Sequence, residues 1–233
     1  MTTLYIDTET YSTTDIKHGV YRYSEDPEFR VLMAAWAIDD GPAQVAIGHE
    51  EIVAIPHLLD GSSAVVRVAH NAQFDRICLS RLAALPVGSY LPPEAWEDTM
   101  ALLAEWGYPQ SLEDGAKALG AEPKDSAGRD LIRWFCQPAR NGKRRLPEDH
   151  PEKWAAFVEY CRQDVDTMRD MHKRLLAKHG AWPTEQERQV WIADQKVNDR
   201  GITADLELAA HAVEAASANT KEAKAEARAI TGV

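Results

Sequence analysis

The sequence is poor in the features that mark secreted, zinc-binding and membrane proteins. Its only three cysteines, Cys78, Cys136 and Cys161, lie far apart and form no CxxC motif. That spacing argues against a disulfide framework or a zinc site and fits a reducing cytoplasm. The longest apolar run, residues 31–38, is far too short to span a membrane, and residues 1–20 carry acids where a leader would be basic and apolar. We therefore expect a cytoplasmic protein without a membrane partner.

Positive charge is also scarce. The 233 residues carry a formal net charge of −11, and the sequence pI is near 5.2. Proteins that hold nucleic acid through its phosphates usually present a basic surface, so tight nonspecific binding of a duplex is disfavoured. An enzyme that captures a strand end through bound metal ions is not excluded, because the cations cancel local negative charge.

Hydrophobic periodicity predicts a strand-rich first half followed by helices. Strands are expected at residues 4–6, 31–38, 44–48, 64–69 and 95–96, and helices at 50–59, 71–85, 99–106, 111–119, 128–136, 152–179, 184–198 and 205–230, with a polar loop over 11–30. This order indicates an α/β fold: a mixed sheet of about five strands flanked by helices, with a C-terminal helical extension. We divide the chain into a main domain, residues 1–180, and an extension, residues 181–233. The last helix has too narrow an apolar face to be stable alone, so we expect it to need a neighbour.

The first candidate site is Ile6-Asp7-Thr8-Glu9-Thr10. Leu4 to Ile6 read as a short buried strand, and side chains two apart on a strand point to the same face. Two adjacent carboxylates at the end of that strand repel each other and are costly to bury, which a divalent cation would offset. Taken alone, Asp7 and Glu9 could equally be surface acids where the strand emerges.

Two further motifs carry acids. In Asn71-Ala72-Gln73-Phe74-Asp75, Asn71 is a candidate N-cap and Asp75 falls in the first turn of the helix, so the motif could be capping alone or could supply a metal ligand. In the second motif, Tyr160 stands four residues before Asp164 and would share its face of the long helix. Taken alone, that pair could simply border the core.

The three motifs together resemble the DEDD superfamily of 3′–5′ exonucleases over residues 4–171. Asp-x-Glu, Asn-x-x-x-Asp and Tyr-x-x-x-Asp occur in the order typical of its tyrosine branch, whereas the histidine branch would place His where Glu159 stands. The resemblance implies an RNase H-like sheet and two Mg²⁺ or Mn²⁺ ions. These would be held by the four acids of the motifs, Asp7, Glu9, Asp75 and Asp164.

The resemblance also implies roles for the residues around these acids. Tyr160 would orient the attacking water, because a phenol with an ordinary pKa of about 10 is a poor base. Thr10 and the backbone near Thr8 would face the terminal nucleotide, and Asn71 would hold Asp75 or the substrate. Asp98 is interpreted as structural.

A narrower resemblance concerns residues 19–32, 111–120, 128–132 and 187–205. These segments are similar to the exonuclease region of phage-type family A DNA polymerases and to the segment where it passes into the polymerase portion. No polymerase catalytic motif follows before Val233, so the chain is interpreted as a fragment or a stand-alone exonuclease. A polymerase domain, following Val233 or acting in trans, is an expected partner.

These resemblances imply a metal-dependent 3′–5′ exonuclease that acts on a single-stranded or frayed DNA 3′ end, in proofreading. Two alternatives stay open: an exoribonuclease of the same superfamily, and a catalytically silent scaffold that binds nucleic acid. The basic loop at residues 140–145 could contact phosphates or could be a solvated loop.

Overall fold

The computed structural model describes residues 2–59, 64–121 and 128–232 of the chain. Its centre is a five-stranded sheet in the order β3-β2-β1-β4-β5. The strands are β1 (Thr2–Tyr11), β2 (Arg30–Ile38), β3 (Gln44–Ile47), β4 (Val65–Ala69) and β5 (Trp96–Asp98). β1 pairs antiparallel with β2 and parallel with β4, so the sheet is mixed. The predicted α/β class with a mixed sheet of about five strands is confirmed.

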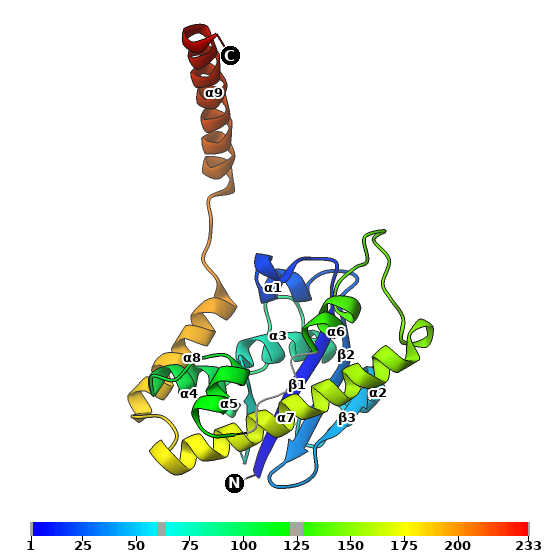
Figure 1. Cartoon of the computed structure of the whole chain (residues 1–233). Helices are drawn as coiled ribbons and strands as arrows, with labels where there is room; N and C mark the ends of the chain where they lie inside the picture. The colour runs from blue at the N-terminus through cyan, green and yellow to red at the C-terminus, as the bar shows by residue number, and fades with distance from the viewer. Residues whose placement is uncertain (1, 60–63, 122–127, 233) are drawn as a thin grey trace. The chain divides into compact units, whose positions relative to one another are not determined.

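Helices cover both faces of the sheet (Figure 1). They are α1 (Val20–Ser24), α2 (Gly48–Val53), α3 (Ala72–Leu82), α4 (Thr99–Glu105), α5 (Leu112–Ala118), α6 (Gly128–Phe135), α7 (Pro151–His179), α8 (Glu185–Arg200) and α9 (Leu206–Thr231). Short 3-10 turns occur at Ile16–His18, Pro93–Ala95 and Pro147–Asp149. The expected loop over residues 11–30 was wrong in part, since it contains a 3-10 turn and α1. Burial of Val20 and Tyr23 explains the helix, because both side chains pack into the body of the protein.

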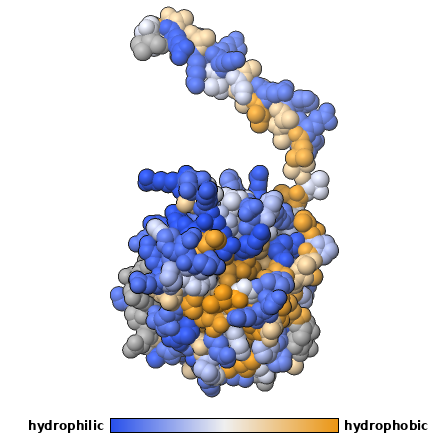
Figure 2. All heavy atoms as spheres, turned by 90° about the vertical axis from the view of Figure 1, so that its right-hand side faces the viewer, coloured by the Kyte–Doolittle hydropathy of each residue, from blue (hydrophilic) through white to orange (hydrophobic). Residues whose placement is uncertain are grey.

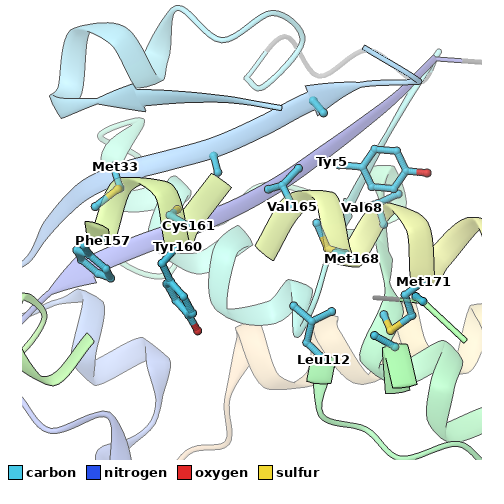
Figure 3. Packing of buried hydrophobic residues seen from close by; sticks show 14 of the residues in the cluster. Tyr5, Met33, Val68, Leu112, Phe157, Tyr160, Cys161, Val165, Met168 and Met171 are labelled. Atoms are coloured by element: carbon cyan, nitrogen blue, oxygen red, sulfur yellow. The ribbon is translucent and has the colours of Figure 1, made fainter. Parts of the chain in front are cut away.

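β1 is the central strand, and its alternating side chains enter two different cores. Tyr5 and Tyr11 pack in a cluster with α7, whereas Leu4 and Ile6 pack in a second cluster with residues of α2 and α3. In Figure 3 the buried face of α7 lies along the sheet and presents a row of apolar side chains from Phe157 to Met171. Full burial of each such side chain is worth about 1.5–3 kcal/mol. This packing holds α7 across β1.

The described chain divides into two compact units, and the boundary in the sequence falls between Asp199 and Arg200. α8 belongs to the first unit, where Trp191 packs against the second core and Ile192 is buried. α9, in the second unit, buries none of its residues. The sequence-based division at residue 180 stays a prediction. Among the described helices, none has the length and apolar character that a bilayer crossing needs.

Candidate active site

Asp7 and Glu9 lie inside β1 and not at its end, which corrects the expectation from the sequence. β1 continues to Tyr11 because β2 goes on pairing with it past Glu9. On its other side the parallel pairing with β4 stops at Tyr5. The β4 side of the strand is therefore open at Asp7, and another element can approach the two acids there.

The start of α3 occupies this opening and brings in Asp75. Its Oδ1 accepts hydrogen bonds from the Thr8 backbone N–H at 2.9 Å and from Thr8 Oγ1 at 2.7 Å. Burial raises the pKa of Asp75 well above its ordinary value, and the charge of Asp7 raises it further, while the two hydrogen bonds from Thr8 oppose the shift. Asp75 is thus a buried acid hydrogen-bonded to Thr8, the residue of β1 that stands between Asp7 and Glu9 in the sequence. It is not in the group of donor atoms that lie within 4.8 Å of one another.

Asp98 orders the start of α3, a role that the sequence assigned to Asn71. Asn71 is the N-cap residue, but its side chain makes no capping hydrogen bond and its backbone is left-handed, with φ 67°. The Asp98 carboxylate accepts hydrogen bonds from the backbone N–H groups of Asn71 and Ala72, at 3.0 Å each, and also caps α4. The structural role of Asp98 is confirmed. The substrate contact of the exposed Asn71 stays a prediction.

α7 brings the third motif to the same place. Tyr160 and Asp164 are one turn apart, both are buried, and they are hydrogen-bonded to each other. Burial raises the pKa of Tyr160 well above its ordinary value, and the neighbouring charges of Asp164, Glu9 and Asp7 add to this effect. The phenol is therefore a neutral hydrogen-bond donor, which suits the predicted orienting role better than that of a base.

A thiol that the sequence analysis overlooked completes the cluster. Donor atoms of Asp7, Glu9 and Cys161 all lie within 4.8 Å of one another, and Cys161 Sγ is 3.8 Å from Asp7 Oδ2. The sequence analysis gave Cys161 no role in the site, and its position one residue after Tyr160 was the available signal. Burial and the two carboxylates raise the pKa of this thiol well above its ordinary value. A protonated thiol is a poor ligand for a metal ion.

A cavity of about 210 Å³ opens beside Glu9 and is also lined by Thr8 and Thr10. A second cavity, of about 200 Å³, shares Tyr23 and Cys136 with the first and is not lined by Glu9. Both are bordered by Tyr23 of α1, whose hydroxyl lies 2.8 Å from Thr10 Oγ1. The two threonines that were predicted to face a nucleotide therefore line a space next to the acids. Tyr23 belongs to helix α1, which the sequence did not predict.

Comparison with known proteins bears on this arrangement. No protein-family model matches the chain. The whole chain is similar to a DNA polymerase of Bacillus phage SP02, with 38% identity over an alignment 248 residues long. The chain is a homologue of a phage DNA polymerase. It spans 36% of the length of that polymerase.

This homology confirms the relationship to a phage polymerase that the sequence predicted, while the assignment to the tyrosine branch stays a prediction. A solved structure described as the apo form of a nuclease is also similar. It has a TM-score of 0.48 and 18% identity, and the match covers 84% of this chain and 81% of that chain.

Proposed function

We propose that the chain is a metal-dependent 3′–5′ exonuclease that removes nucleotides from single-stranded or frayed DNA ends, in proofreading for a DNA polymerase. The observation that carries the proposal is the approach of Asp7 and Glu9 to each other within 4.8 Å on β1, against α7. Asp75 accepts a hydrogen bond from the backbone of Thr8, the residue between the two acids, and Asp164 interacts with Tyr160 on α7. Their approach to Asp7 and Glu9 as metal ligands is part of the proposal. Homology to a DNA polymerase makes a DNA end the expected substrate and a polymerase domain the expected partner.

The donor set fits hard divalent cations. Asp7, Glu9, Asp75 and Asp164 would hold two Mg²⁺ or Mn²⁺ ions, because carboxylate oxygens are the ligands these ions prefer. When bound, such ions lower the pKa of a water and stabilise charge on the phosphate. The raised pKa values of the two thiols beside them, Cys161 and Cys136, keep both protonated and disfavour binding of a soft metal.

The chain's own side chains would position the reactants. The neutral phenol of Tyr160 would hydrogen-bond to the attacking water and orient it. Thr8 fixes Asp75 through its backbone and its hydroxyl, so Asp75 approaches the site in one orientation. The cavity lined by Thr10 and Tyr23 is the space in which we place the terminal nucleotide, with Asn71 at the start of α3 as a further contact.

Digestion of end-labelled oligonucleotides tests the proposal. A DNA strand labelled at its 5′ end should shorten stepwise, and one labelled at its 3′ end should release the label at once, with Mg²⁺ or Mn²⁺ but not with a chelator. Matched RNA should be degraded more slowly. Faster digestion of RNA would favour the exoribonuclease. Failure to release any nucleotide with Mn²⁺ present would favour a catalytically silent scaffold.

A further inference from the structure

A larger cavity lies away from the acids, where β2 begins and β3 ends. It measures about 540 Å³ and shares no lining residue with the 210 Å³ cavity beside Glu9. Its floor includes Val31 and Leu32 of β2, and its walls include Trp154 of α7. Figure 2 views the side of the molecule on which α2 and the first turn of α7 lie, and it shows hydrophobic surface bordered by hydrophilic side chains. A cavity of this size accommodates a ligand of nucleotide dimensions.

Three guanidinium groups from separate elements line this cavity. Arg30 begins β2, Arg81 lies in the last turn of α3, and Arg144 lies in the basic loop, while no Asp or Glu is among the lining residues. None of the three forms an ion pair with a carboxylate of the described residues. Arg30 donates a hydrogen bond to the Phe29 carbonyl and Arg81 donates one to the Pro86 carbonyl, but neither meets a carboxylate. In a chain with a net charge of −11, three such cations around one cavity point to an anionic ligand.

The orphaned donors within the cluster point the same way. The Nε atoms of Arg81 and Arg144 are both buried, and neither has a hydrogen-bond partner. Buried polar atoms normally have a partner, because an unsatisfied donor costs about 1–3 kcal/mol. A ligand with acceptor oxygens would supply that partner.

Neighbouring arginines of the basic loop have different environments. Arg145 donates a hydrogen bond to the Trp134 carbonyl at 2.7 Å and lies over the Trp134 ring, so it anchors the loop. Arg144 makes no hydrogen bond to the described residues, and its guanidinium lies 5.6 Å from the centre of the Tyr11 ring. Arg145 therefore anchors the basic loop, and the preceding residue, Arg144, lines the cavity.

Tyr11 connects the cavity to the candidate active site. It belongs to β1, two residues beyond Glu9, which is about 7 Å along a strand. Arg144 therefore lies near the end of the strand that carries Asp7 and Glu9. A chain of phosphates that leaves the acids along β1 would meet this cation next.

We propose that the 540 Å³ cavity binds the single-stranded DNA segment that lies upstream of the 3′ end held at Asp7 and Glu9. Arg144, Arg81 and Arg30 contact its phosphates, and a base stacks on Trp154. Cations on three separate elements suit a polyanion better than a single nucleotide, and base stacking on an aromatic ring is tolerant of sequence. This inference rests on the proposed exonuclease function, because that function places the DNA end.

Binding measured without turnover tests the inference. In chelator, fluorescence anisotropy should show that Arg144→Gln weakens binding of an oligonucleotide of about 12 nucleotides roughly tenfold, which is what loss of one charge-assisted contact costs. The slope of log K against log[salt] should fall by about 0.7. An oligonucleotide of about four nucleotides, which ends before the cavity, should bind equally well to both proteins. Trp154→Leu should weaken the long oligonucleotide without changing the salt slope.

Arg174→Gln is the matched control, because it removes the same charge from an exposed ion pair with Asp170 on α7. The inference is overturned if Arg144→Gln behaves like this control, if it weakens short and long oligonucleotides equally, or if thymidine monophosphate binds as tightly as the long oligonucleotide and with the same dependence on Arg144. If short oligonucleotides are digested normally while long ones bind independently of Arg144, the proposed function survives and this inference fails. If nothing is digested, the proposed function itself fails.

Discussion

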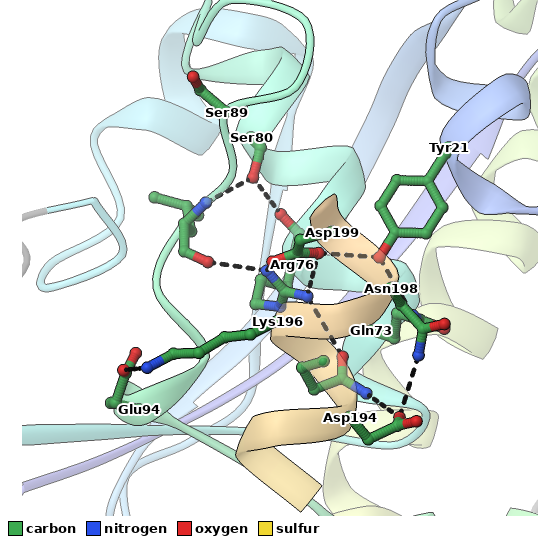
Figure 4. Close-up of polar contacts among 12 residues, drawn as sticks. Tyr21, Gln73, Arg76, Ser80, Ser89, Glu94, Asp194, Lys196, Asn198 and Asp199 are labelled. Atoms are coloured by element: carbon green, nitrogen blue, oxygen red, sulfur yellow. Dashed lines mark hydrogen bonds and ion pairs between the residues drawn. The ribbon is translucent and has the colours of Figure 1, made fainter. Parts of the chain in front are cut away.

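Arg76 and Asp199 form a bidentate ion pair inside the first compact unit. Both N–O distances are 2.8 Å, and the Arg76 side chain is 0% exposed (Figure 4). Asp199 also accepts a hydrogen bond from the Tyr21 hydroxyl at 2.8 Å. Arg76 directly follows Asp75 on α3, and Asp199 lies near the end of α8. The pair therefore fastens α8 to the helix that brings an acid to the candidate active site.

Removal of one partner of this ion pair should destabilise the protein strongly. We expect Asp199→Ala to lower the free energy of unfolding by about 3–5 kcal/mol, because it leaves the buried Arg76 cation without its counter-charge. Urea denaturation measures the change. Asp194→Ala removes an exposed acid from the same helix and should cost less than about 0.5 kcal/mol. If both variants lowered the free energy of unfolding equally, the buried ion pair would contribute no more to stability than an exposed acid does.

Loss of a candidate metal-binding acid should abolish turnover and spare the fold. Asp7→Ala should lower the rate of nucleotide release about a hundredfold or more, since it removes charge that the reaction needs. Its circular dichroism spectrum should match that of the wild type. Glu159→Ala is the control, because Glu159 is an exposed acid next to Tyr160 whose partners among the described residues are Arg162 and Gln163. Nearly normal rates in Asp7→Ala would contradict the assignment of this residue as a ligand.

Gly128 should be required for the position of Tyr160. A Cβ atom at residue 128 would lie 1.9 Å from Cε2 of the Tyr160 ring, so Gly128→Ala must displace the ring. We expect Gly128→Ala and Tyr160→Phe each to slow nucleotide release, and both less than Asp7→Ala does. Because the two changes act through one side chain, the double variant should be no slower than the slower single variant. If the losses of rate in the two single variants added fully in the double variant, Gly128 would not act through Tyr160.

Binding of Mn²⁺ should stabilise the protein by mass action. At a free concentration one hundred times Kd, binding to the folded state alone contributes about 2.7 kcal/mol. Thermal denaturation with millimolar Mn²⁺ should show a higher Tm than denaturation in chelator. The shift should be smaller in Asp7→Ala and unchanged in Glu159→Ala. A wild-type Tm that does not change with Mn²⁺ would count against the proposed metal site.

Asp98 should make stability depend on pH. Burial raises its pKa to about 6, and hydrogen bonds from four backbone N–H groups only partly oppose the shift. The folded protein binds the Asp98 proton more tightly than the unfolded chain does. The contribution of this protonation to the free energy of unfolding is therefore fully present below about pH 4 and is lost as pH rises through 6. Relative to the wild type, Asp98→Asn should therefore gain stability between pH 4 and 6, measured by urea denaturation. Asp130→Asn, at an exposed position, should show no such trend.

The candidate site could be predicted in part from the sequence. Spacing of two along a strand and of four along a helix placed Asp7 beside Glu9 and Tyr160 beside Asp164, because these periods are properties of the local backbone. Cys161 was not predicted at the site, since nothing local shows that α7 would cross β1 at Asp7. The capping of α3 by Asp98 was missed because Asp98 lies 27 residues after Asn71 and 26 after Ala72. The pairing of β4 with β5 brings Asp98 to the start of α3.

By itself, the sequence determined the α/β class, the order of strands and helices and the residue types of the site. Those depend on periodicity and on side-chain chemistry that each segment carries alone. The tertiary structure decided how far β1 extends, which cation of the basic loop faces a cavity, and how Arg76 meets Asp199. Each of these depends on a neighbour that is distant along the chain, and packing against that neighbour supplies the free energy that local propensity lacks.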